Sequence, residues 1–375
     1  MIKRLLPWCM ALMLVLAVGA CGNDDSGTSG DSGTKAESGK KSVKVGLILD
    51  GAADDGGWSQ LWAEAAEKVK QEIPGTEISI VPKTGYGAPM QKAAQTFVAQ
   101  GYDLVVSSST GSDGDIAKVA KDAPDTKFAV AYGTRITDNL ASASPAIEEG
   151  RYLDGIIAGA ATKAGSIGYV GGYPVPAVVR PLDSFTMGAH TVNPDVQVKV
   201  LYVNSWFDPE KERQAAQALV DDGADVLAMD ANSPAVPSVA KSANAGFVGY
   251  GRTRAANAPD QWLSTFTFNW VPYLKKYIEA IQNDTWKSSL DYWGLKEGAI
   301  GITELGPNVT DEAKAKVQEA RDKIISGELK IFTGPITDNE GNTKVADGDV
   351  LDTSDELLAC CDWHVDGVVG KVPKS

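Results

Sequence analysis

The chain has 375 residues, of which 43% are hydrophobic and 22% are charged, enough for one large or two medium-sized domains with their own cores. Its formal net charge of −14 argues against nucleic acid as a partner, because the phosphates would be repelled by such a surface. The charge does not restrict small-molecule ligands.

Residues 1–21 have the order of a secretory signal peptide: a basic pair, the apolar run 11–18 and then small residues. Cys21 directly follows the small residues and resembles the lipidated first residue of mature bacterial lipoproteins; an ordinary signal peptide with an incidental cysteine is the alternative. No later segment has 18 consecutive apolar residues. We therefore expect an extracytoplasmic protein that is anchored to the bacterial cell membrane through lipid and is not embedded in it.

Residues 22–42 are rich in Gly, Ser and charged residues and show no apolar periodicity. Such a segment cannot bury enough apolar surface to order itself. We expect a flexible linker here.

From residue 43 on, short apolar runs typical of buried strands alternate with amphipathic helices. The expected strands are 44–48, 78–82, 103–109, 127–132, 166–172, 196–203, 224–230 and 246–251, and the expected helices are 58–72, 88–100, 113–121, 147–163, 176–190, 209–222 and 234–244. This repetition predicts parallel sheets, and its two runs predict two lobes, 43–148 and 149–267. The alternative, one large doubly wound sheet, would be unusually wide.

The last third of the chain is less regular. Residues 262–268 read as a strand that returns toward the first lobe, and helix 270–282 follows, so part of 268–372 is expected to join that lobe. A helix near 309–327 and a strand-like ending at 363–370 come after it. The adjacent Cys360 and Cys361 read as two buried thiols rather than a strained vicinal disulfide, and their spacing does not favour a metal site.

Each lobe carries an aromatic residue between the end of a strand and the start of a helix. Trp58 stands at the first such corner, and Trp206 stands two residues before Asp208-Pro209, a strong helix-start signal. In open α/β sheets this edge is where ligands bind. The two rings could hold the faces of one flat ligand, although each could also pack under its own loop.

Polar side chains occupy the same edge at further strand ends. These candidate ligand contacts are Asp50, Ser59, Ser108, Thr110, Asp230 and Asn232, which are also ordinary cap and turn residues. Catalytic motifs are missing: the sequence has no HExxH, no GxSxG and only two histidines. We therefore expect a binding protein with no catalytic residues, no metal and no cofactor.

Several long segments carry a resemblance to a known family: DDGGWS, EEGRYLDGIIAG, IGYVGGYPVPAVVRPLDSFTMGA, NSWFDPEKERQAA, GADVLAMDANSPA, TFNWVPY, TWKSSLDYWGL and DWHVDGVVG. Over roughly residues 44–372 the chain resembles the basic membrane protein family of ABC-transporter substrate-binding lipoproteins, in particular its branch of purine receptors. The resemblance implies a type I periplasmic-binding-protein fold, with two Rossmann-like lobes, a hinge, three crossovers and a central ligand cleft. It also implies a ligand held between Trp58 and Trp206 and contacted by Asp50.

The sequence departs from this family where nucleoside-binding relatives hold ribose. Gly251 stands in place of an aspartate, and Phe268 in place of a lysine, while Arg252 and Arg254 are added. Trp62 stands where the purine-base branch has a histidine. Gly251 remains a candidate ligand contact.

The sequence thus predicts a monomeric receptor that captures a purine-like base or nucleoside and delivers it to an ABC permease. The first alternative is the same fold with a non-purine ligand, in which Arg252 and Arg254 hold an anion. A signalling or adhesion lipoprotein is the second, and an enzyme on a related fold is disfavoured by the missing catalytic motifs.

Overall fold

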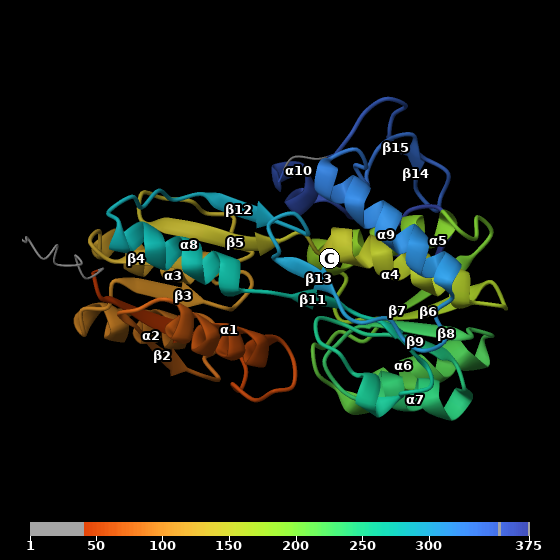
Figure 1. The fold of residues 1–375 in the computed structure, drawn as a ribbon, viewed down its shortest axis with the longest axis horizontal. Coiled ribbons are helices and arrows are strands. Elements are labelled where there is room, and N and C mark those ends of the chain that lie inside the picture. Colours follow the sequence, from red (N-terminus) through yellow and green to blue (C-terminus); the bar gives the residue numbers. More distant parts are fainter. Residues whose placement is uncertain (1–40, 352–353, 374–375) are drawn as a thin grey trace, which may run out of the picture. The chain divides into compact units, whose positions relative to one another are not determined.

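The computed structural model describes residues 41–351 and 354–373 (Figure 1). The predicted signal peptide, its Cys21 and all but the last two residues of the predicted linker lie outside the described residues. Among the described helices, none combines the length and the apolar character needed to cross a membrane.

Two separate six-stranded sheets confirm the expectation of two lobes. The first has the order β12-β5-β4-β3-β1-β2, and every neighbouring pair in it is parallel. Its strands are β1 (Val43–Ile48), β2 (Thr76–Val81), β3 (Leu104–Ser107), β4 (Lys127–Ala131), β5 (Leu140–Pro145) and β12 (Leu290–Trp293). The sequence reading missed β5, because its LASASP stretch has small and polar residues in place of an apolar run, although all six are buried.

The second sheet has the order β10-β9-β8-β6-β7-β16 and is also parallel throughout. Its strands are β6 (Ser166–Gly171), β7 (Gln197–Tyr202), β8 (Val226–Asp230), β9 (Gly246–Val248), β10 (Trp262–Ser264) and β16 (Val368–Val369). Two small antiparallel pairs complete the described strands: β11 (Phe266–Phe268) with β13 (Ile300–Ile302), and β14 (Ile336–Thr337) with β15 (Thr343–Val345).

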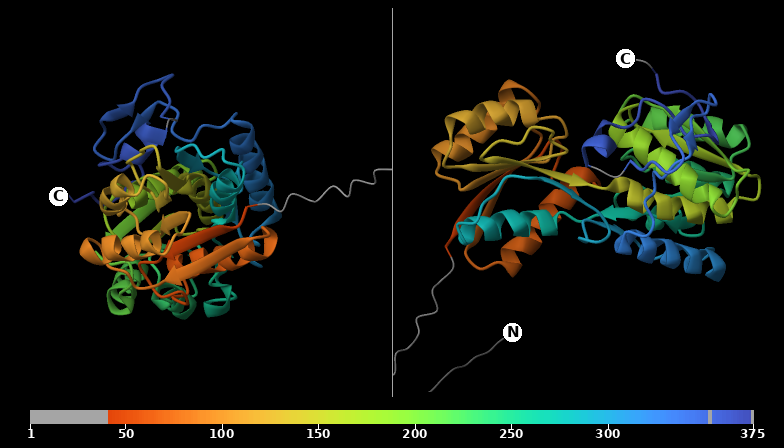
Figure 2. Two further views of the ribbon diagram at one scale, coloured as in Figure 1. Left: turned by 90° about the vertical axis from the view of Figure 1, so that its left-hand side faces the viewer. Right: turned by 90° about the horizontal axis from the view of Figure 1, so that it is seen from above.

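Helices cover both faces of each sheet (Figures 1 and 2). In the first lobe, α2 (Ala88–Ala99) and α3 (Asp113–Asp122) lie on one face, and α1 (Trp58–Glu72) and α8 (Val271–Gln282) pack together on the other. In the second lobe, α6 (Pro209–Asp221) and α7 (Ala235–Ala243) cover one face, and α4 (Ile147–Ala161) and α5 (Pro176–His190) cover the other. A 3₁₀ helix (Ala255–Asn257), α9 (Asp311–Ser326), which packs on α4, and α10 (Ser354–Ala359) complete the helices of the described chain.

The described chain passes between the sheets three times: between β5 and β6, between β10 and β12, and between β12 and β16. The prediction of one strand at 262–268 that returns to the first lobe was wrong. Its first half stays in the second sheet as β10, and its second half pairs with β13 as β11. The buried Asp154 stabilises the point where β10 ends and β11 begins, because it accepts hydrogen bonds from Ser264 Oγ at 2.6 Å and from the Phe266 amide at 3.0 Å.

The C-terminal segment docks on the second lobe, where β16 extends the sheet beside β7. His364 is buried and contacts Asp183 Oδ1 through Nδ1 at 2.9 Å and the Tyr202 hydroxyl through Nε2 at 3.1 Å. Cys360 and Cys361 are joined by a vicinal disulfide across a cis peptide bond. The prediction of two buried thiols was therefore wrong, because the two sulfur atoms are bonded to each other.

Candidate functional site

A cleft of about 820 Å³ lies at the carboxyl ends of strands from both sheets. It is lined by Asp50, Gly51, Asp55, Trp58, Ser59, Tyr86, Thr110, Tyr132, Thr134, Ile147, Tyr173, Val175, Pro176, Ala177, Val178, Arg180, Trp206, Phe207, Asn232 and Tyr250. Six of the nine predicted ligand contacts are among them: Asp50, Trp58, Ser59, Thr110, Trp206 and Asn232. Strand-end placement therefore brought most of the predicted set into one cleft.

Trp58 begins α1 and is held in a fixed orientation by its neighbours. Its indole Nε1 donates to the carbonyl oxygen of Ser108 at 2.9 Å. Phe268 and Trp270 contact it edge-on, with ring centroids 5.1 and 4.9 Å away. Tyr132 lies nearly parallel to it at 6.2 Å. The ring is thus set in place by the protein before any ligand arrives.

Trp206 follows β7 in the second lobe and is 43% exposed. Its ring lies over Gly172, where an added Cβ would come within 2.7 Å of the indole. Tyr173 contacts it at 5.0 Å with the planes tilted by 59°. A glycine beneath the ring is required for this position, because any side chain there would displace the indole.

Asp50 follows β1, and only one of its two carboxylate oxygens accepts hydrogen bonds from the described residues. Oδ1 accepts hydrogen bonds from the Gly51 amide, from Ser59 Oγ and from Ser108 Oγ at 3.0 to 3.2 Å. Among the described residues, no hydrogen bond goes to Oδ2. The second oxygen can therefore accept a hydrogen bond from an N–H group in the cleft.

Ser108, Asp230 and Gly251 do not line the cleft. Ser108 is buried and positions both Asp50 and Trp58. Asp230 is 2% exposed, and its carboxylate oxygens accept from Arg151 Nη2 at 2.5 Å and from the Tyr169 hydroxyl at 2.6 Å. Both of its oxygens are thus occupied inside the second lobe.

Gly251 has a φ of +63°, and an added Cβ would lie 2.9 Å from the Phe268 ring. Phe268 is 5% exposed and lies outside the cleft lining. The two departures from the nucleoside-binding pattern are therefore in contact: the phenyl ring fills the space beside Gly251.

The arginines of the anion alternative also lie outside the cleft lining. Arg252 forms an ion pair with Glu64 of α1, with Nη1 2.8 Å from Oε1. Arg254 Nη2 donates to the carbonyl oxygen of Asn232 at 2.7 Å. Trp62 is fully buried and stacks on Trp270 with centroids 4.1 Å apart, so it belongs to the core.

The sequence reading missed the tyrosines that line the cleft. Tyr132, Tyr173 and Tyr250 each come within two residues of a strand's carboxyl end, the same signal that selected the tryptophans. Burial raises the pKa of Tyr132 well above its usual value, and it raises the pKa of Tyr86 more modestly with help from the Asp50 charge. The hydroxyls of Tyr132 and Tyr86 therefore stay protonated and act as neutral hydrogen-bonding groups.

Arg180 was missed as well, because it lies in the middle of a helix that reads as ordinary core. It is 1% exposed and lines the cleft from α5. A charged residue within the otherwise apolar run PAVVRPL was the available signal.

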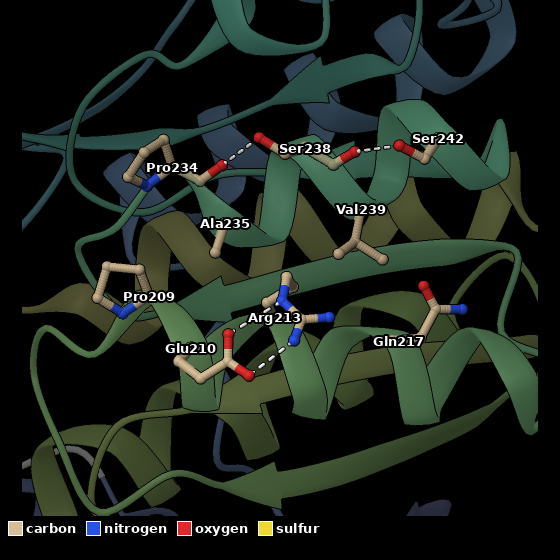
Figure 3. A pocket seen from close by; sticks show the side chains of 9 residues that line it. All are labelled: Pro209, Glu210, Arg213, Gln217, Pro234, Ala235, Ser238, Val239 and Ser242. Carbon is tan, nitrogen blue, oxygen red and sulfur yellow. Dashed lines mark hydrogen bonds and ion pairs between the residues drawn. The ribbon is translucent and has the colours of Figure 1, made fainter.

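A second, smaller pocket of about 530 Å³ lies between α6 and α7 (Figure 3). Its polar side chains already have partners within the protein. Arg213 pairs with Glu210 at 2.7 Å, and Gln217 bonds Asp221 at 2.8 Å. Ser238 and Ser242 each donate to the backbone four residues earlier. These polar side chains are therefore not left for a ligand, and we take the larger cleft as the candidate site.

Residues 42–333 match the family described as PnrA-like ABC transporter substrate-binding protein. A purine-binding protein of Brucella abortus is 35% identical over 336 residues, which are 89% of this chain and 95% of that protein. A Haloferax volcanii protein named as a candidate ABC transporter glucose-binding protein is 29% identical over 334 residues, 89% of this chain and 82% of the relative. An ABC transporter solute-binding protein structure from Conexibacter woesei covers 77% of this chain and 98% of its own at 26% identity, with a TM-score of 0.67.

Proposed function

The chain belongs to the family of PnrA-like ABC transporter substrate-binding proteins, and on this basis we propose that it captures a purine-like solute, as the free base, between Trp58 and Trp206. Proteins of this family are solute-binding receptors and not enzymes. They bind a small molecule outside the cytoplasm and work with an ABC permease. The identity of the solute and its mode of binding are the parts that we propose.

One observation carries the proposal: two tryptophans, one from each lobe, line the same cleft. Trp58 is fixed by its hydrogen bond to Ser108, and Trp206 rests on Gly172. Stacking of a base on an aromatic side chain contributes on the order of 1–3 kcal/mol. The purine-binding relative supports a purine as the ring that is stacked.

The region around Gly251 favours a base without ribose. At the place where the nucleoside-binding pattern has an aspartate for the ribose hydroxyls, this chain has Gly251, which has no side chain to accept from them. Phe268 closes the space beside it and packs edge-on against Trp58. Buried hydroxyls without partners cost about 1–3 kcal/mol each, so the nucleoside should bind more weakly than its base.

Calorimetric titration of one preparation with adenine, hypoxanthine, adenosine, inosine and glucose tests the proposal. We expect both bases to bind, and each nucleoside to bind more weakly than its base. Tighter binding of the nucleosides would refute the interpretation of Gly251 and Phe268. If glucose binds and none of the purines does, the purine ligand is refuted, and the result agrees with the name of the Haloferax relative.

The stacking arrangement is tested by Trp206→Ala, for which we expect a loss of affinity of about ten- to a hundredfold. Trp206→Phe retains an aromatic face and is the matched control, with a smaller loss. Trp206 is exposed, so its replacement should not disturb the core. If Trp206→Ala binds the ligand as tightly as the parent protein does, stacking of the ligand between Trp58 and Trp206 is refuted.

Membrane attachment through a lipid on Cys21 is a separate part of the proposal, and Cys21 lies outside the described residues. Fractionation of cells that express Cys21→Ser tests it. We expect the variant to leave the membrane fraction, and its retention there would refute a lipid anchor.

A further inference from the structure

Arg180 is a buried cation on the wall of the cleft. It lies on α5, is 1% exposed, and is the cleft-lining arginine of the second lobe. A guanidinium in such a place carries five N–H donors and no acceptor, and it remains charged at any physiological pH. If the protein already provides an acceptor for each of these donors, the role of Arg180 is structural; a donor without a partner is available to a ligand.

The protein provides hydrogen-bond acceptors for only some of the N–H groups of this guanidinium. Nε donates to Glu148 Oε2 at 3.1 Å, and Nη1 donates to the backbone carbonyl of Leu357. Glu148 is itself held, because its other oxygen accepts from the Tyr292 hydroxyl. Nη2 is buried and has no hydrogen-bond partner among the described residues.

An unpaired donor on a buried cation is costly, and native proteins rarely leave one without a purpose. Because Arg180 lines the cleft, a ligand acceptor can supply the missing partner. The bonds from Nε and Nη1 fix the guanidinium plane, so Nη2 is oriented before the ligand binds.

We propose that Arg180 determines specificity by donating from Nη2 to an oxo group on the bound ring, so that the receptor prefers oxopurines to adenine. This inference rests on the proposed capture of a purine base. A carbonyl oxygen accepts a charge-assisted hydrogen bond from arginine, as guanine O6 does in DNA recognition. The exocyclic amino group of adenine is a donor and would leave Nη2 unpaired. The open oxygen of Asp50 is then available to a ring N–H group.

The unmodified protein gives the first test, in which hypoxanthine, adenine and unsubstituted purine are titrated by calorimetry. The three share the ring system and differ at position 6. We expect hypoxanthine to bind about ten- to a hundredfold more tightly than the other two. If adenine or purine binds as tightly as hypoxanthine, the role of Arg180 is refuted while the purine receptor stands. If none of the three binds, the proposed function itself fails.

The second test is Arg180→Lys, which retains the charge beside Glu148 but loses the fork that presents Nη2. We expect hypoxanthine affinity to fall about tenfold, with the affinity for unsubstituted purine unchanged. An equal loss for both ligands would show a merely structural role and overturn the inference. Arg213→Lys in the exposed pair with Glu210 (Figure 3) is the matched control and should leave both affinities unchanged. If Arg180→Lys does not fold, the comparison of ligands on the unmodified protein decides.

Discussion

Ser108 links Trp58 and Asp50, two of the first-lobe residues that line the cleft. Its carbonyl oxygen accepts from the Trp58 indole, and its hydroxyl donates to Asp50 Oδ1. Ser59 adds a second hydroxyl to the same oxygen. Each of these bonds removes freedom from a side chain that would otherwise have to be ordered by the ligand, and such preorganisation strengthens binding. Ser108 thus acts on the site through Trp58 and Asp50 and without lining the cleft.

Glu149 gives a prediction at the residue scale. Burial raises the pKa of its carboxyl from 4.5 to about 7, against the hydrogen bond from the Leu295 amide, which lowers it. The folded state therefore favours the neutral form. The stability from this group is fully present below pH 4.5 and is lost as the pH rises through 7.

Glu149→Gln resembles the neutral carboxyl group at every pH. We expect the variant to match the parent near pH 4 and to exceed its free energy of unfolding at pH 8 by at most about 3 kcal/mol. Denaturant unfolding at the two pH values measures this difference. Glu67→Gln, the same substitution at an exposed position of α1, is the matched control. An identical difference at both pH values would contradict the assignment.

At the scale of elements, α4 and α5 approach each other through glycines. An added Cβ at Gly155 would lie 1.9 Å from the carbonyl oxygen of Phe185, and one at Gly188 would lie 2.1 Å from that of Tyr152. These contacts are with backbone, which cannot move aside as a flexible side chain can. The close pairing places Arg180 of α5 beside Glu148 of α4, so the packing of two helices sets the geometry of the cleft wall.

Gly188→Ala should consequently lower the free energy of unfolding by about 1–3 kcal/mol, because the added methyl group forces the helices apart. This exceeds the helix propensity of up to about 1 kcal/mol that alanine adds. Gly85→Ala is the control: the position is exposed and an added Cβ would meet nothing within 4 Å. Thermal and denaturant unfolding of both variants measure the effect, and equal stability of the two would contradict tight helix packing.

At the scale of the whole receptor, the lobes touch beside the cleft as well as through the crossovers. Arg252 of the second lobe pairs with Glu64 of the first, and Asn232 lies close to Gly57. A two-lobe receptor that closes on its ligand by hinge bending would form such contacts in the closed state and break them on opening. The ion pair is partly exposed, so its contribution is small, at most about 1 kcal/mol.

Charge reversal tests this role without altering the cleft lining. We expect Arg252→Glu and Glu64→Arg each to weaken ligand binding by about two- to fivefold, because like charges oppose closure. The double variant restores an opposite-charge pair and should recover the affinity. Calorimetry with the ligand that binds the parent protein makes the measurement, and additive losses in the double variant would exclude the pair from closure.

The sequence by itself determined the local elements and the edge of the sheets where the site lies. The expected helices 58–72 and 176–190 agree with α1 and α5, because apolar periodicity and helix-start residues act over a few positions. Trp58 and Trp206 were found in the same way, since strand ends in parallel sheets point to one edge.

Only the tertiary structure decided what depends on residues far apart in the chain. β12 and β16 complete the two sheets from the C-terminal part, and no local pattern marks which sheet a short strand will join. Both carboxylate oxygens of Asp230 accept hydrogen bonds within the second lobe, one of them from Arg151, 79 positions away, whereas Arg180, which lines the cleft, keeps a buried nitrogen without a partner. The sequence shows which groups can donate and accept, but long-range packing decides which of them the protein has already used and which are left for a ligand.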